Sequence, residues 1–153
     1  MRKRIAPVPV LAALLSLAGC GMPSLKVDAV VGVTKAYSTC VGEGPFTCEW
    51  FGEEAEQLRE AGGEYGAKTG RPRRVGWLDA VILNHVRRIS GLNYLSLMLF
   101  DVLSGVEKIR ICTGYKLDGK AIDYVPSTIS QLSRVEPEYI ELDGWNEDIS
   151  SIK

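Results

Sequence analysis

Residues 95–102, which read LSLMLFDV, form a nearly continuous apolar run that ends at Asp101 and Val102. A run of this length without polar alternation predicts a central strand that is buried on both faces. Residues 108–115, KIRICTGY, alternate between apolar and polar side chains and predict another strand. We therefore expect the core of the fold to contain a sheet that includes both segments.

Helices are predicted upstream of these strands. Residues 77–89 gather apolar side chains on one face and predict an amphipathic helix, with His85 on or beside that face as a boundary residue. Residues 53–61 predict a short charged helix that is closed by two glycines. Residues 26–35 are predicted to form a helix that leads into a short strand.

The C-terminal part of the chain predicts a further mixture of strands and helices. The expected elements are a turn at residues 117–120, a partner strand at 121–125, a short helix at 127–134 capped by Ser127, and a last strand at 139–142. Alternating helices and strands without an obvious linker predict one α/β unit, a mixed sheet with flanking helices.

Composition and charge narrow the functional classes. The chain has 153 residues, of which 46% are hydrophobic and 24% charged, and its net charge is -1. A chain of this size can bury the core of one domain. The nearly neutral balance argues against nucleic-acid binding driven by overall charge, so phosphate binding would need a local cluster of cations.

The cysteines predict no metal site. Cys20, Cys40, Cys48 and Cys112 form no CxxC pair, and the single histidine lies far from all four in sequence. Since zinc needs about four ligands in close array, ordinary reduced or buried thiols are expected, with disulfides left open.

Residues 66–76, GAKTGRPRRVG, contain four cations and three glycines and predict a loop. Its guanidinium groups, Arg71, Arg73 and Arg74, suit bidentate binding of carboxylate or phosphate oxygens, and Thr69 adds a hydroxyl. The loop therefore suits an anionic small ligand such as a dicarboxylate or a nucleotide phosphate. The alternative is a solvated turn whose arginines pair with acids of the chain, such as Glu64 or Asp79. No nucleophile with a neighbouring base and no GxxxxGK[ST] loop is evident.

The first 24 residues allow two interpretations. Three basic residues precede an apolar run at 5–18, and residues 17–20 read LAGC. This pattern is typical of a bacterial lipoprotein signal, in which Cys20 would carry the lipid, and the run is too short to span a bilayer. The alternatives are a short apolar core segment or a start codon inside a longer reading frame.

Several motifs occur in a fixed order: KAYST at 35–39, VGEGPF at 41–46, TGRPRR at 69–74, GWLDA at 76–80, DVL at 101–103 and GW at 144–145. Together they resemble adenylosuccinate synthetase, over about residues 26–149. The resemblance implies a fragment of a larger nucleotide-binding α/β fold, with residues 25–153 as the family region and residues 1–24 as a separate apolar segment. It also implies a ligase of purine and AMP biosynthesis that joins IMP and L-aspartate, with GTP and Mg²⁺ and no nucleic acid.

The resemblance also implies roles for residues of the basic loop. The residues expected to bind aspartate and IMP are Ala67, Lys68, Thr69, Gly70 and Arg71, and those expected to bind GTP are Arg73 and Asp101. The chain departs from the family pattern at Cys40, Thr47, Cys48, Lys68 and Leu99. The family's phosphate loop, its catalytic aspartate and histidine, and therefore its metal ligands have no counterpart in this sequence, so the chain alone is expected to be inactive.

The expected location and assembly of the protein depend on whether the N-terminal segment is a lipoprotein signal. A synthetase fragment is expected in the cytoplasm, where GTP and IMP are found, and a homodimer as in the family is one expected assembly. The alternative is an exported lipoprotein that reuses the fragment as a binding scaffold and is anchored to the membrane through Cys20.

Overall fold

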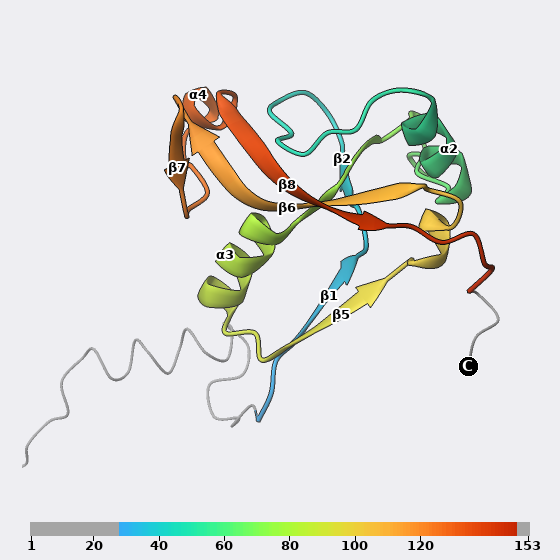
Figure 1. Cartoon of the computed structure of the whole chain (residues 1–153), viewed down its shortest axis with the longest axis horizontal. Coiled ribbons are helices and arrows are strands. Elements are labelled where there is room, and N and C mark those ends of the chain that lie inside the picture. The colour runs from blue at the N-terminus through green and yellow to red at the C-terminus, as the bar shows by residue number, and fades with distance from the viewer. Residues whose placement is uncertain (1–27, 150–153) are drawn as a thin grey trace, which may run out of the picture.

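The computed structural model describes residues 28–149, so the predictions for the basic and apolar N-terminal segment and for Cys20 lie outside the described residues. The described chain is a mixed α/β unit, as predicted (Figure 1). Its elements, in order, are β1 Val31–Lys35, β2 Ser38–Cys40, α2 Glu53–Ala61, β3 Arg74–Gly76, β4 Leu78–Asp79, α3 Ala80–Ser90, β5 Tyr94–Met98, the 3-10 helix η1 Asp101–Leu103, β6 Lys108–Leu117, β7 Lys120–Ile122, α4 Ile129–Leu132 and β8 Val135–Asp143.

The largest sheet is built around β6, which pairs with β4 in parallel and with β7 and β8 in antiparallel fashion. In a regular strand Cys112 and Tyr115 would point to opposite faces, because they are three residues apart. The pairing with β8 shifts its register between Cys112 and Gly114, which adds a residue to β6 and reverses the alternation. Both Cys112 and Tyr115 are consequently buried.

The predicted helix at residues 26–35 is wrong for the part that the structure describes. Val31–Lys35 is strand β1, which pairs in parallel with β5. Its β-branched residues, such as Val31 and Val33, fit an extended backbone better than a helix.

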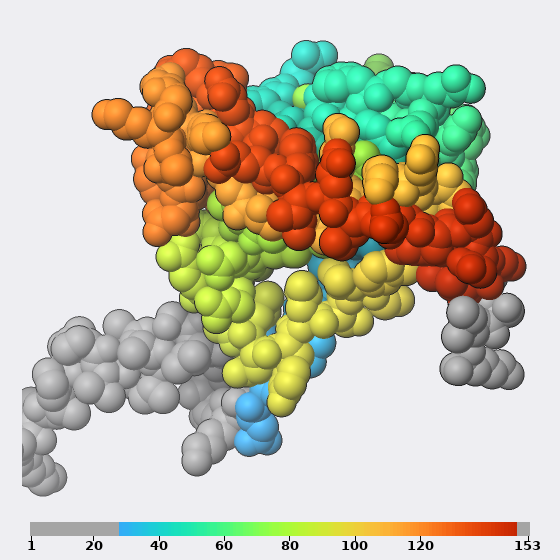
Figure 2. Space-filling view, viewed as in Figure 1, coloured from blue at the N-terminus to red at the C-terminus, as the bar shows by residue number. Residues whose placement is uncertain are grey.

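The central strand predicted at residues 95–102 is shorter and more exposed than expected. β5 ends at Met98, since Leu99 adopts a positive φ of 61° and Asp101 begins η1. Tyr94 is 64% and Met98 51% exposed. Within the described residues β5 has β1 as its one strand partner, so its apolar side chains lack the layers that cover both faces of most parallel sheets. Figure 2 shows this segment, in yellow, at the surface below β8.

The amphipathic helix is confirmed with a later start. α3 begins at Ala80 because the Asp79 side chain accepts hydrogen bonds from the first free amides, those of Val81 and Ile82. It ends at Gly91, which adopts the left-handed conformation, and α3 contacts β6. His85 is half-buried, as expected for a boundary residue.

Several other boundaries differ from those predicted, and β7 ends at Ile122 rather than at residue 125. The C-terminal part of the expected 66–76 loop is strand β3, because the buried Val75 pairs with Thr39 of β2. α4 is capped by Thr128 and not by Ser127, and β8 is longer than the strand expected at 139–142. The helix at residues 53–61 has the predicted bounds.

The core near β3 is closed by two tryptophans. The rings of Trp50 and Trp77 stack with centroids 3.8 Å apart. The Trp77 amide donates to the Cys48 carbonyl at 2.9 Å, and this contact brings the chain around Cys48 against Gly76. A Cβ at Gly76 would lie 2.5 Å from the Cys48 carbonyl oxygen.

We expect Gly76→Ala to lower the free energy of unfolding by about 1–3 kcal/mol, because backbone must move to admit the methyl group. Urea unfolding of the full chain measures this change. Gly114→Ala is the matched control, since its Cβ would meet the tip of the Glu138 side chain, which can rotate away. Equal losses in the two variants would contradict the close approach at Gly76.

Candidate functional site

The Glu64 carboxylate is the centre of the basic region, although its residue is only 2% exposed. Its Oε1 accepts hydrogen bonds from Lys35 Nζ at 2.5 Å and from the Tyr37 hydroxyl at 2.6 Å, and its Oε2 accepts from Arg73 at 3.0 Å. Two cations and one hydroxyl therefore compensate the burial of this acid. Its partners come from β1, from the corner before β2 and from the basic loop.

The backbone of the loop is fixed next to the same carboxylate. The Arg73 amide donates to the Glu64 carbonyl, and Arg59 Nε of α2 donates to the Arg73 carbonyl at 2.7 Å. Inside the loop, the Gly66 amide donates to Arg71 O and the Gly70 amide to Gly66 O. Gly70 adopts a φ of 63°, which glycine tolerates at no steric cost. Backbone hydrogen bonds thus fix the loop at both of its ends.

A hollow of about 290 Å³ opens beside this loop. It is lined by Val41, Gly42, Gly66, Thr69, Arg71, Pro72 and Arg73. Arg71 is exposed, and its side chain makes no hydrogen bond or ion pair with another residue of the described range 28–149. Arg73 Nε is buried and has no hydrogen-bond partner there. Arg71 therefore brings to the hollow a guanidinium group that the described chain leaves unused.

Arg74 does not belong to this group, which corrects the expectation that three guanidinium groups converge. Its side chain forms a bidentate pair with Glu49, in which Nε donates to Oε1 at 2.7 Å and Nη2 to Oε2. Nη1 donates to the Gly42 and Gly44 carbonyls. Arg74 is not among the residues that line the hollow, and its side chain braces the residue 42–49 segment.

The other expected site residues fall into two groups. Ala67, Lys68 and Gly70 are exposed on the loop but do not line the hollow. Asp101 is exposed at the start of η1 and also stands outside the lining. The Asp101 carboxylate raises the pKa of Tyr37 and the Arg73 guanidinium lowers it, both as smaller effects than burial.

The surroundings of Glu64 and Tyr37 shift the pKa of each side chain. Burial by itself would raise the pKa of Glu64, but hydrogen bonds from Lys35, Tyr37 and Arg73 outweigh it and lower that pKa below its ordinary value. Burial first, and then the Glu64 carboxylate, raise the pKa of Tyr37. Glu64 is therefore an anion and Tyr37 a neutral donor at neutral pH.

Sequence reasoning found the arginines but missed the residues that hold them. Glu64 entered only as an alternative partner for the basic loop, and it does pair with Arg73. Lys35 and Tyr37 belonged to a recognised motif, but no local pattern signals that they meet an acid 29 and 27 residues away. Asp79, the other suggested acid, instead caps α3.

This arrangement can bind an anion but offers no acid–base machinery of its own. Guanidinium groups, the Thr69 hydroxyl and a glycine-flanked backbone favour carboxylate or phosphate oxygens. The fold and the hollow together define a class, an α/β unit with a hollow that is lined in part by arginines of a glycine-rich loop.

Comparison with known proteins specifies this class further. The sequence model of the family "Adenylosuccinate synthetase" matches residues 10–153, and the chain belongs to that family. The match begins inside the apolar N-terminal segment and continues through the described residues. The predicted mixed α/β fold and the predicted family are thus both confirmed.

Individual relatives agree. The chain is 56% identical to the adenylosuccinate synthetase of Limosilactobacillus reuteri and 54% identical to that of Listeria welshimeri, each over 135 residues, 88% of this chain. It is similar in structure to the fully ligated adenylosuccinate synthetase from Plasmodium falciparum, with a TM-score of 0.78, 40% identity and 83% of this chain covered. It spans 31% of the length of each of these three proteins.

No helix among residues 28–149 has the length and apolar character needed to cross a bilayer.

We expect Glu64→Gln to lower the free energy of unfolding by about 2–3 kcal/mol at pH 7, because the variant loses the charge-assisted hydrogen bonds to Lys35 and Arg73. Solvent partly screens these two cations, which keeps the loss within this range. The pKa of Glu64 is lowered in the fold, so its stabilisation is complete above the carboxyl's unfolded pKa and is lost as the pH falls through the folded value. The wild-type and variant unfolding curves should therefore converge in acid. Glu54→Gln on the exposed side of α2 is the control and should change little; a difference that persists at low pH would contradict the assignment.

Proposed function

We propose that this chain supplies the aspartate-binding loop and part of the nucleotide contacts of an adenylosuccinate synthetase, which ligates IMP and L-aspartate with cleavage of GTP. The observation that carries the proposal is the hollow beside residues 66–73, where Arg71 has no side-chain partner among residues 28–149 and Arg73 is held by Glu64. A dicarboxylate needs two sets of donors, and this hollow offers guanidinium, hydroxyl and backbone donors together.

Within this proposal the loop residues have different roles. Ala67, Lys68, Thr69, Gly70 and Arg71 contact the aspartate carboxylates and IMP. Arg73 and Asp101 contact GTP, and the Asp101 carboxylate can accept both N1–H and N2–H of guanine. Support for Thr69 and Arg71 comes from their position on the hollow; support for Ala67, Lys68 and Gly70 comes from their exposure on the same loop.

We also propose that the chain is catalytically incomplete by itself. The sequence contains neither a GxxxxGK[ST] loop nor the family's catalytic aspartate and histidine, and it spans 31% of its relatives' length. No residue is therefore available to deprotonate IMP or to hold Mg²⁺. Polypeptide carrying the other two thirds of the fold would supply these groups.

The exposed β1–β5 pair supports this incompleteness. Val31, Val33 and Tyr94 present apolar surface on a two-stranded parallel sheet, and parallel sheets are normally covered on both faces. A complementing polypeptide would bury this surface.

The proposal also includes a location and an assembly. A cytoplasmic location is proposed because the substrates are found there, and homodimerisation is proposed as in the family. The competing function is a binding scaffold anchored to the membrane through Cys20, and it requires the N-terminal segment to act as a lipoprotein signal.

The proposal is tested by complementation. The full chain alone, supplied with IMP, aspartate, GTP and Mg²⁺, should form no adenylosuccinate. Mixing it with a polypeptide that carries the remaining two thirds of the Limosilactobacillus reuteri enzyme should produce turnover. Turnover by the chain alone would overturn the incompleteness, and absence of turnover in a mixture shown to associate would overturn the proposed function.

In the complemented enzyme, Arg71→Ala should raise KM for aspartate about 10–100-fold, because a charge-assisted bond to a carboxylate is worth roughly 1.5–3 kcal/mol. Steady-state kinetics with varied aspartate measures the change. Arg88→Ala, which removes an exposed arginine of α3 outside the hollow, is the control and should leave KM unchanged. Equal KM values in Arg71→Ala and wild type would contradict the role of Arg71.

A further inference from the structure

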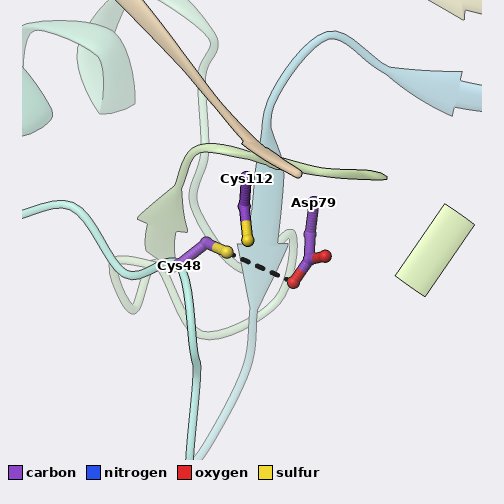
Figure 3. A group of neighbouring side chains, drawn as sticks. All are labelled: Cys48, Asp79 and Cys112. Atoms are coloured by element: carbon purple, nitrogen blue, oxygen red, sulfur yellow. Dashed lines mark hydrogen bonds between the residues drawn. The ribbon is translucent and has the colours of Figure 1, made fainter. Parts of the chain in front are cut away.

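Three buried side chains from distant parts of the sequence meet at the N-terminal end of α3 (Figure 3). Cys48 is 1%, Asp79 5% and Cys112 0% exposed. Cys48 precedes the Trp50 corner, Asp79 ends β4, and Cys112 lies in the middle of β6. One ligand atom from each, two thiol sulfurs and a carboxylate oxygen, lie within 4.8 Å of one another. We call these three residues the thiol–carboxylate cluster.

Asp79 is the unusual member of the cluster. Within residues 28–149 this buried carboxylate forms no salt bridge, whereas the other buried acid, Glu64, has two. Its carboxylate oxygens instead accept hydrogen bonds from Cys48, Tyr115 and the first amides of α3. Because burying a charge without a counter-charge is costly, a cation beside Asp79 would be electrostatically favoured.

The surroundings orient the carboxylate as a metal ligand requires. Oδ1 accepts from the Val81 and Ile82 amides, each at 3.0 Å, and the Tyr115 hydroxyl donates to Oδ2. Ligands in metal sites are commonly fixed by such outer hydrogen bonds. Oδ2 also lies 3.2 Å from Cys48 Sγ and faces both sulfurs (Figure 3).

The spacing fits a tetrahedral ion. Zinc bonds of about 2.3 Å to sulfur and about 2.0–2.2 Å to oxygen imply a sulfur–oxygen separation of roughly 3.6 Å. The observed 3.2 Å needs a movement of only a few tenths of an ångström. Tyr139 pairs with Cys112 across the β6–β8 ladder, so its side chain lies beside the cluster.

We propose that Cys48, Asp79 and Cys112 form a binding site for a thiophilic divalent cation of the zinc class. Binding would displace the Cys48 thiol proton, which now points to Asp79, and the Cys112 thiol proton, which now points to the Gly114 carbonyl. Two protons leave and two sulfur–metal bonds form, so no oxidant or reductant is required. The cation would join β6, β4 and the residue 46–50 segment, which is a structural role separate from the anion hollow.

Cadmium titration of the full chain tests this site, because cadmium–thiolate bonds absorb in the near ultraviolet. We expect one ion per chain, with the absorbance lost in Cys48→Ser and in Cys112→Ser. Cys40→Ser, which changes a half-exposed cysteine outside the cluster, should keep it. Tyr115→Phe, which removes the donor to Asp79 Oδ2, should weaken binding roughly 10–100-fold.

A second measurement uses the unmodified protein and so does not depend on the folding of variants. Zinc should slow alkylation of Cys48 and Cys112, detected by mass spectrometry of their peptides, but not alkylation of Cys40. The proposal is overturned if folded wild type gives no cadmium–thiolate absorbance at excess metal. It is also overturned if the absorbance persists when Cys48 and Cys112 are both serine, or if zinc leaves the alkylation of both unchanged.

Discussion

The arrangement of the basic loop depends on one buried carboxylate, that of Glu64. A carboxylate at this depth is tolerated because Lys35, Tyr37 and Arg73 all donate to it. These donors belong to segments that are far apart in the sequence, so satisfying the acid also fixes where β1, β2 and the loop lie. The direction of Arg73, and through its backbone the position of Arg71 on the hollow, follows from this single requirement.

Asp79 is also a buried carboxylate, but it is stabilised differently from Glu64. It has no cationic partner within the described residues, and its charge is offset by helix amides, a thiol and a phenol. These contacts serve α3, because an N-terminal carboxylate satisfies free amides and interacts favourably with the helix dipole. They also leave one carboxylate oxygen directed at two thiols, from which the proposed cation site arises. The two buried acids thus organise different parts of the fold, Glu64 the basic loop and Asp79 the start of α3.

The exposed β1–β5 pair shows what a part of a larger fold looks like when it stands alone. Its sequence has the continuous apolar character of a covered parallel strand, but the described chain covers only part of it. The β6 sheet is different: β8 pairs along its whole length, α3 contacts it, and Ile109, Cys112 and Tyr115 are buried. The described chain therefore combines a sheet that its own strands and helix cover with an exposed apolar pair of strands. It spans 31% of the length of its relatives.

Local sequence determined the features that short-range physics controls. The helix at residues 53–61, the amphipathic character of α3, the tight turn at residues 117–120 and the glycine-rich basic loop all follow from periodicity, caps and turn residues. The ordered motifs likewise identified the family. Only the tertiary structure decided that Arg74 turns to Glu49 while Arg71 has no partner in the described part of the chain, and that Cys48, Asp79 and Cys112 meet. The physical reason is that buried charges and thiols choose partners by position in space, and those partners lie 25 to 64 residues apart in a sequence that carries no local sign of the contact.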